Sequence, residues 1–382
     1  MGESRPLQKK RNILRLGYCI AIILLLLREG VVIYSRWKVK KLKVDIVYLW
    51  SDDGDFAPLK KGQTAATEAE EAKKNKPNSR SKFNSSERLK FSLRSLEKYA
   101  PWINHLFIVT NSHVPSWLNT KSGKITVVSQ SQIMPKKHKS SSPFSFSAVE
   151  FYLHKIPSLS EHFLYANDDM FFGSKVNPWF FFDRKSNPVI RGFKIIGFSK
   201  KKKNLEEYVK NTNKIYNQTI FYSLNLVMKK FKNAPDIFPH HNIDAYRKSY
   251  VEDTLLTFKK EYDYTFSHSS RRKSTLQRII ISYVDYAKKR GTIKYVRPKY
   301  SPLLRKFHFL TKCQDSLHRS LTYFNAKNTE QFKKFEKEKS WLRQEKFPLF
   351  CFSDDSESSE TDRREASKFL GELFPKKSSF EK

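Results

Sequence analysis

Short apolar runs alternate with amphipathic stretches along the first half of the chain. Four runs rich in β-branched and aromatic residues predict strands at 44–50, 106–110, 125–128 and 163–166. Leucines at helical spacing predict a helix from Ser86 to about Tyr99, and the apolar face of 145–155 predicts a second helix. Strands that alternate with helices are typical of α/β folds. The pattern therefore predicts a mainly parallel, Rossmann-like sheet with flanking helices.

The second half of the chain has a more helical pattern. Helices are predicted from just after Asp244 to about Lys260, at Leu276–Lys289 and at Ala326–Lys346. An apolar strand is predicted at Phe347–Phe352, followed by a polar linker and a short terminal helix at Phe369–Phe374. We expect these segments to be additions to a single domain that spans residues 44–382.

Acidic residues follow two of the predicted strands. Asn167, Asp168 and Asp169 come directly after 163–166, and Ser51-Asp52-Asp53-Gly54-Asp55 comes after 44–50. In parallel α/β sheets, polar chemistry collects beyond the carboxyl ends of the strands. Two acidic strand ends on one rim favour a divalent-cation or phosphate site, and the alternative is two unrelated acidic turns.

The chain is strongly basic. It holds 73 Lys and Arg against 38 Asp and Glu, which gives a formal net charge of +35 and predicts affinity for anions. The basic runs are scattered, and we find neither zinc-finger spacing nor basic-leucine-zipper heptads. We therefore expect no nucleic-acid partner, although the charge also permits a protein that only binds an anionic glycan or another polyanion.

The N-terminus carries a hydrophobic run, Leu16–Leu27, preceded by a basic segment. Twelve residues are short for a membrane span, which needs about 20, so the predicted anchor extends over 13–34. It would follow a cytosolic basic tail at 1–12 and precede a basic stalk at 35–43, as a single-pass type II signal anchor; a buried or peripheral helix is the alternative. Sequons at Asn84 and Asn217 are compatible with glycosylation in a secretory lumen, and Cys313 and Cys351 could form a disulfide.

Four blocks of sequence, in order, resemble the Stealth proteins. These are bacterial capsular-polysaccharide phosphotransferases and the catalytic subunit of the animal lysosomal-enzyme GlcNAc-1-phosphotransferase. The resemblance runs through 44–55, with Tyr48, Trp50, Asp52 and Asp55, then through 83–190, 240–290 and 347–381. Its longest part includes Leu93–Trp102 and Phe163–Gly173.

The resemblance implies transfer of a sugar-1-phosphate from a nucleotide-diphosphate sugar to a hydroxyl of a glycan or polysaccharide, with release of a nucleoside monophosphate. It places the catalytic positions on Glu150, Asp169, His241 and Arg271, with His241 as our choice of base. Mg²⁺ or Mn²⁺ held by Asp168 or Asp169 would neutralise the pyrophosphate. The remaining substrate-binding positions are Asp52, Asn167, Lys248 and Asp354. The implied compartment is the Golgi in a eukaryote or the inner membrane in a bacterium.

Several positions depart from the family pattern, among them Ser85-Ser86, Phe151-Tyr152, Thr275 and Ser353. They stand where donor or acceptor contacts are expected, so the sugar, the nucleotide and the acceptor are left open. A metal-dependent glycosyltransferase that transfers the sugar alone is the nearest alternative, and the released nucleotide distinguishes the two reactions.

Overall fold

The computed structural model describes residues 41–51, 85–111, 114–135, 146–195, 215–268, 272–296, 316–320, 330–354 and 358–382, and the single residues 22, 26, 30, 32, 34, 39 and 324. Among these residues, no helix is both long and apolar enough to span a membrane. Most of the anchor predicted at 13–34 lies outside the described residues, so the anchor stays a prediction.

The main sheet has five strands in the order β3-β2-β1-β4-β8. Its strands are β1 (Val44–Leu49), β2 (Leu106–Thr110), β3 (Ile125–Ser129), β4 (His162–Ala166) and β8 (Asp244–Arg247). β1 is parallel to β2 and to β4, β2 is parallel to β3, and β8 closes the edge antiparallel to β4. The predicted mainly parallel sheet is confirmed.

Apolar side chains of β1 alternate between the two faces of this sheet, as the pleat of a strand requires. Val44, Ile46 and Tyr48 belong to one apolar cluster, and Val47 and Leu49 belong to the other. Both faces of the strand are therefore buried, which explains why every residue of β1 except Asp45 is apolar or aromatic.

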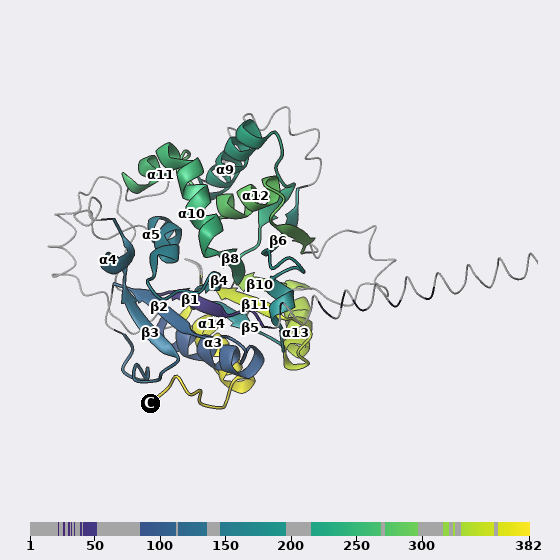
Figure 1. The fold of residues 1–382 in the computed structure, drawn as a ribbon. Coiled ribbons are helices and arrows are strands. Elements are labelled where there is room, and N and C mark those ends of the chain that lie inside the picture. The colour runs from purple at the N-terminus through teal and green to yellow at the C-terminus, as the bar shows by residue number, and fades with distance from the viewer. Residues whose placement is uncertain are drawn as a thin grey trace, which may run out of the picture.

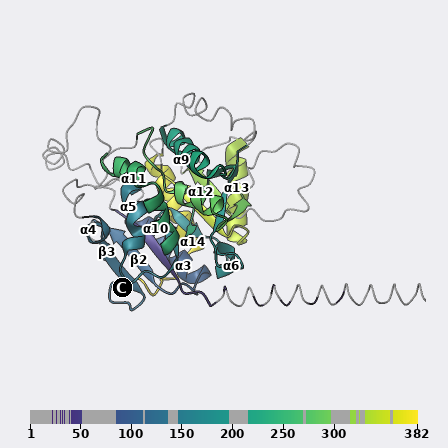
Figure 2. The same ribbon diagram turned by 45° about the horizontal axis from the view of Figure 1, so that its top comes forward.

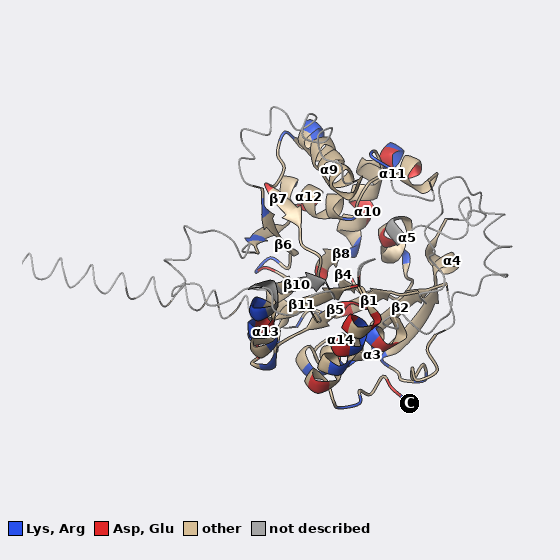
Figure 3. Ribbon diagram, turned by 180° about the vertical axis from the view of Figure 1, so that it is seen from behind, with Lys and Arg blue, Asp and Glu red and all other residues tan. Residues whose placement is uncertain are grey.

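Helices cover the two faces of the main sheet in two layers (Figures 1 and 2). On one face lie α3 (Ser85–Tyr99) and α14 (Glu360–Leu373). The helices of the other face are α5 (Phe146–Tyr152), α9 (Ile215–Phe231), α10 (Lys248–Thr257), α11 (Lys259–Phe266) and α12 (Ile279–Ala287). The described residues also form the short helices α4 (Gln130–Ile133), η2 (Leu153–Lys155) and α6 (Pro178–Phe181), and the longer α13 (Glu330–Arg343). Lys and Arg lie on helices of both layers and not along one stripe (Figure 3).

Two three-stranded sheets accompany the main sheet. One joins β10 (Ser316–Ser320), β11 (Leu349–Ser353) and β5 (Met170–Phe172), and the other joins β7 (Ile237–Pro239), β6 (Val189–Lys194) and β9 (Thr292–Tyr295). β5 and β11 can approach closely because Gly173 follows β5: its N–H donates to the Pro348 carbonyl at 2.9 Å, and a Cβ there would meet the Phe347 carbonyl oxygen at 2.3 Å. The predicted strand at 347–352 is confirmed as β11.

Three expectations from the sequence pattern are corrected. The predicted helix after Asp244 starts later, because residues 244–247 form β8 on the open edge of β4. The terminal helix starts at Glu360 and not at Phe369, since Ser359 and Asp362 form a capping box at its N-terminus, so most of the predicted polar linker is helical. The third sheet and the helix α9 were not predicted.

Candidate active site

The carboxyl end of β4 carries the acidic stretch. The Met170 N–H donates to the Asn167 carbonyl at 3.2 Å, so 167–170 is a β-turn with Asp168 and Asp169 at its two central positions. β4 lies beside β1, whereas β2 and β3 lie on the other side of β1. The order of the strands thus reverses between β1 and β4, and in open α/β sheets ligands bind beyond the carboxyl ends of the strands at such a point.

His241 is the partner of Asp169. It lies in the loop between β7 and β8, and its Nε2 is 3.2 Å from Asp169 Oδ2. The other carboxylate oxygen, Asp169 Oδ1, is buried and has no partner at hydrogen-bond geometry, although the Cys351 thiol lies close enough to Asp169 to act as a weak donor. A buried, unpaired carboxylate oxygen is costly in free energy, so this atom is suited to a cation or to a proton donor on a ligand.

Asp169 and His241 shift each other's pKa in the direction that favours the charged form of both residues. Burial acts to lower the pKa of His241, but the charge and hydrogen bond of Asp169 outweigh burial and raise that pKa above its ordinary value of 6.5. Burial likewise acts to raise the pKa of Asp169, and His241, with a smaller contribution from Arg88, brings it below its ordinary value. Each residue of the pair therefore stabilises the charged form of the other.

Cys351, on β11, completes a group of potential metal ligands. The ligating atoms of Asp169, His241 and Cys351 all lie within 4.8 Å of one another. The strand is held here because the Phe352 N–H donates to the Asp169 carbonyl at 3.1 Å. Cys351 is a free, buried thiol whose pKa is raised by burial; Cys313 lies outside the described residues. The Asp169 carboxylate fits the oxygen-seeking Mg²⁺ or Mn²⁺ predicted from the sequence, whereas the nitrogen and sulfur ligands beside it suit Zn²⁺-like cations.

Asp168 points to a different partner. Arg88 Nε, on α3, lies 2.9 Å from Asp168 Oδ2, and Arg88 Nη1 is 3.8 Å from Asp354 Oδ2. Asp354 in turn accepts two hydrogen bonds from Arg363, at 2.9 and 3.2 Å. The structure therefore brings the predicted residues Asp168 and Asp354 together through arginines, and Asp168 is not part of the group around Cys351.

Glu150 and Asn167 share a second network, centred on Tyr165. The Tyr165 hydroxyl lies 2.8 Å from Glu150 Oε1 and 2.7 Å from Asn167 Oδ1, and shares its one proton between them. Tyr165 packs in the apolar cluster on the α5 and α12 side of the sheet, whereas Asp168, in the turn after β4, contacts Arg88 on α3.

Arg278, at the start of α12, neutralises this network. Its Nε is 3.3 Å from Glu150 Oε1, its Nη1 is 2.6 Å from Asp244 Oδ2, and its guanidinium lies 4.2 Å above the Tyr165 ring. Burial raises the pKa of Asp244, while Arg278 and, more weakly, His241 and Arg191 act to lower it. Arg278 thus fixes two carboxylates next to the Asp169–His241 pair.

The remaining predicted residues do not join this centre. Lys248 begins α10, and its N–H donates to the Glu161 carbonyl, just before β4. It therefore lies at the opposite end of β4, roughly 20 Å along the strand from Asp169. Asn217 lies in the first turn of α9, where Thr219 of its sequon is buried. Asp52, Asn84 and Arg271 lie outside the described residues.

Sequence reasoning missed four residues that organise the site. They are Arg88, Tyr165, Asp244 and Arg278. Tyr165 had a usable signal, since it stands two residues before Asn167 and so faces the same side. Arg88 and Arg278 had no such signal, because nothing in the sequence distinguishes them from the other basic residues in a chain with 73 Lys and Arg.

Comparison with known proteins connects this centre to a family. Residues 82–190 match the family described as Stealth protein CR2, conserved region 2. A capsular polysaccharide phosphotransferase of Haemophilus influenzae is 32% identical over 256 residues, which cover 64% of this chain and 65% of that protein. An exopolysaccharide phosphotransferase of Lactiplantibacillus plantarum is 35% identical over 145 residues, covering 38% and 41% of the two chains.

The human N-acetylglucosamine-1-phosphotransferase subunits alpha/beta are 41% identical over 109 residues, covering 28% of this chain and 8% of that protein. The chain spans less than two thirds of the length of each of these relatives. Among solved structures, the galactosyltransferase LgtC in complex with donor and acceptor sugar analogs aligns with 9% identity and a TM-score of 0.39. The alignment covers 86% of this chain and 96% of the LgtC chain. Similarity at that level bears on neither the fold nor the activity.

The matched region contains Arg88, Glu150, Tyr165, Asp168 and Asp169, which are the residues on α3, α5 and β4 that build the centre. The resemblance inferred from the sequence is thereby confirmed: residues 82–190 are similar to conserved region 2 of the Stealth proteins.

Proposed function

We propose that the protein is a sugar-1-phosphate transferase. It would move a hexose-1-phosphate from a nucleotide-diphosphate sugar to a hydroxyl of a glycan or polysaccharide, forming a phosphodiester and releasing a nucleoside monophosphate. The observation that carries the proposal is the hydrogen-bonded Asp169–His241 pair beyond the carboxyl end of β4. Asp169 lies in the matched region 82–190, and relatives of the chain are named phosphotransferases.

The reaction needs a base for the acceptor hydroxyl. With its Nε2–H donated to Asp169 Oδ2, the His241 ring carries its lone pair on Nδ1 in the neutral form. Nδ1 then takes the proton as the acceptor oxygen bonds to the sugar-bearing phosphorus. The bond from that phosphorus to the bridging oxygen breaks, and the nucleoside monophosphate leaves with its electron pair.

Positive charge around the centre suits an anionic donor. Arg88 is held between Asp168 and Asp354, and Arg278 is held by Glu150 and Asp244, so both guanidinium groups are fixed before a substrate arrives. Preorganised charge of this kind stabilises a phosphoryl transition state because little reorganisation is needed during the reaction. In this proposal Arg271 and Asp52 add further contacts to the donor, as the family resemblance implies.

Asp169 would hold a divalent cation through Oδ1, whereas Asp168, predicted as a second ligand, is paired with Arg88 and lies outside the group of Asp169, His241 and Cys351. When bound, Mg²⁺ or Mn²⁺ would neutralise the pyrophosphate and its leaving group. The type II anchor at 13–34, with a Golgi or inner-membrane location, belongs to the same proposal, and alkaline extraction of membranes together with protease protection tests it.

The released nucleotide tests the reaction. Purified protein, Mg²⁺ and a panel of nucleotide sugars should release a nucleoside monophosphate in the presence of an acceptor glycan. Asp169→Asn and His241→Ala should abolish that release while the protein stays folded, and His105→Ala, at a histidine bonded to Thr126 on the far side of the main sheet, is the matched control. Release of a nucleoside diphosphate would show a sugar-only transferase and overturn the proposal.

A further inference from the structure

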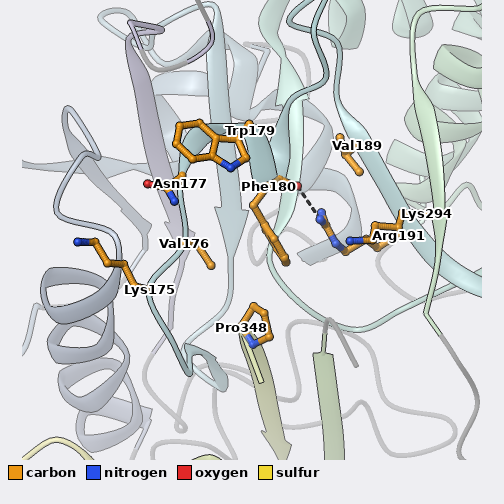
Figure 4. A pocket seen from close by; sticks show the side chains of 9 residues that line it. All are labelled: Lys175, Val176, Asn177, Trp179, Phe180, Val189, Arg191, Lys294 and Pro348. Carbon is orange, nitrogen blue, oxygen red and sulfur yellow. Dashed lines mark hydrogen bonds between the residues drawn. The ribbon is translucent and has the colours of Figure 1, made fainter. Parts of the chain in front are cut away.

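A cavity opens at the end of the β5–β11 pair that lies away from Asp169. Its volume is about 360 Å³, within the range of small-molecule sites. Nine residues line it: Lys175, Val176, Asn177, Trp179, Phe180, Val189, Arg191, Lys294 and Pro348 (Figure 4). They come from the β5–α6 loop, α6, β6, β9 and the residue before β11.

The lining combines aromatic rings with cations. Trp179 is 38% exposed, which leaves a large ring open to a ligand. Lys175, Arg191 and Lys294 contribute positive charge, and none of the nine lining residues in the described part of the chain carries a carboxylate. The site therefore favours an anion that also has an apolar face.

Arg191 gives this cavity a fixed, buried cation. It is 5% exposed, its Nη2 donates to the Phe180 carbonyl at 2.5 Å, and its guanidinium lies 3.6 Å from the centre of the Phe180 ring. Lys294 Nζ lies 5.9 Å from the centre of the same ring. Phe180 thus orients both cations toward one side of the cavity, and Lys175 lies on the opposite side in Figure 4.

The remaining groups suit a sugar ring. The negative face of an aromatic ring attracts the slightly positive C–H bonds on the face of a pyranose, so Trp179 offers a stacking platform. Asn177 precedes α6 without capping that helix through its side chain, and an amide can both donate to and accept from ring hydroxyls.

The cavity is also within reach of the candidate active site. Two hydrogen bonds mark the ends of the pairing between β5 and β11. At one end the Phe352 N–H donates to the Asp169 carbonyl, and at the other end the Gly173 N–H donates to the Pro348 carbonyl. Four residues of strand separate these ends, a distance of roughly 13 Å. A chain of a few linked sugars can span it.

We propose that this cavity binds an acidic sugar unit of the acceptor, a pyranose that carries a phosphate or a carboxylate, several units from the hydroxyl that reacts. The assignment to the acceptor rests on the proposed function, whereas the binding of an acidic sugar does not. Trp179 stacks on the ring, and Arg191 and Lys294 contact the anionic group.

Calorimetric titration of the full-length protein tests the binding. The probes are glucose 6-phosphate and a hyaluronan tetrasaccharide as the two acidic sources, with chitotetraose and inorganic phosphate for comparison. At least one acidic sugar should bind about tenfold more tightly than both comparison probes, because only it uses the ring and the cations together. Equal affinity for inorganic phosphate or for chitotetraose would overturn the proposal.

Two variants locate the site. Trp179→Ala and Lys294→Gln should each weaken acidic-sugar binding by about tenfold, whereas Lys121→Gln, at an exposed lysine outside the cavity, should not. Thermal melting shows whether each variant is folded, and Trp179→Phe, which keeps an aromatic face, should restore part of the affinity. Unchanged affinity in folded Trp179→Ala would disprove the assignment.

Nucleotide release separates this inference from the proposed function. Pocket variants should raise the KM for an acidic acceptor and leave donor hydrolysis without acceptor unchanged. Release of a nucleoside monophosphate without any binding of acidic sugars overturns the inference alone. Binding of acidic sugars without any release overturns the acceptor assignment together with the proposed function.

Discussion

Asp169 Oδ2 and His241 Nε2 are 3.2 Å apart although 72 residues separate them in the chain. β8 makes this contact possible: it pairs Asp244 with Tyr165, and so returns the loop that carries His241 to the carboxyl end of β4. The geometry is that of a base held by a carboxylate, and it has consequences for protonation that can be measured directly.

Removing the carboxylate should lower the pKa of His241. In Asp169→Asn the charge that raises this pKa is gone and burial, which lowers it, remains. We expect the NMR-detected titration of the His241 ring to move from above 6.5 in the wild type to a lower pH in the variant. A titration that stays in place would show that the pair does not interact in solution.

The pH dependence of turnover follows from the same pair. A base must be neutral, so kcat/KM should be lost as the pH falls below the raised pKa of His241 and should rise as the pH increases through it. Initial rates of nucleotide release from about pH 6 to about pH 9 measure this increase of kcat/KM with pH. The proposed reaction uses deprotonated His241, so a profile in which kcat/KM increases toward acid pH would exclude His241 as the base.

Replacement of Arg278 should destabilise the protein strongly. In Arg278→Met, Glu150 and Asp244 lose the cation that neutralises them in a largely buried site, which costs on the order of 3 kcal/mol in the free energy of unfolding. The matched control is Arg343→Met, because Arg343 and Glu372 form an ion pair in which both side chains are nearly half exposed. Urea denaturation should show a change below about 1 kcal/mol for that exposed pair; equal losses would contradict the role given to Arg278.

Two glycines should respond in opposite ways to alanine. At Gly173 a Cβ would meet the Phe347 carbonyl oxygen at 2.3 Å, whereas at Gly371 in α14 the nearest atom is 3.8 Å away. Gly173→Ala should cost on the order of 2 kcal/mol through overpacking. Gly371→Ala should stabilise the helix by about 0.5–1 kcal/mol. The two unfolding free energies, measured side by side, test whether β5 and β11 are packed as closely as described.

The sequence was sufficient to predict those strands and helices that are determined by one local pattern of apolar residues. The runs that form β1, β2 and β4 are apolar on both faces, and the leucines of α3 repeat at helical spacing, so the parallel sheet followed from them. The acidic turn after Ala166 was found for the same reason, since it interrupts two apolar segments.

The sequence was insufficient where tertiary pairing decides. Residues 244–247 continue a helical pattern but become β8, because the edge of β4 offers backbone partners that no local pattern encodes. Arg88 and Arg278 resemble every other basic residue in a chain of net charge +35, and only the fold places them against carboxylates. Asp52 and Arg271 stay predictions, since they lie outside the described residues.

The stability of the fold should depend on the protonation of His154. Burial, aided by the charge of Lys155, lowers the pKa of His154 from 6.5 to about 4, although a hydrogen bond between its Nδ1 and the Phe151 carbonyl opposes the shift. The folded state therefore favours neutral His154. Its contribution to stability is fully present above pH 6.5 and is lost as the pH falls from 6.5 toward 4.

Between about pH 7.5 and about pH 5, this one group should lower the free energy of unfolding by about 2 kcal/mol. His154→Asn, which can keep the contact with the Phe151 carbonyl, should remove that part of the pH dependence, as measured by urea denaturation at both pH values. His268→Asn, at a surface histidine, should leave the dependence as in the wild type. If the two variants flatten it equally, burial of His154 is not the cause, because His268 has no comparable burial in the structure.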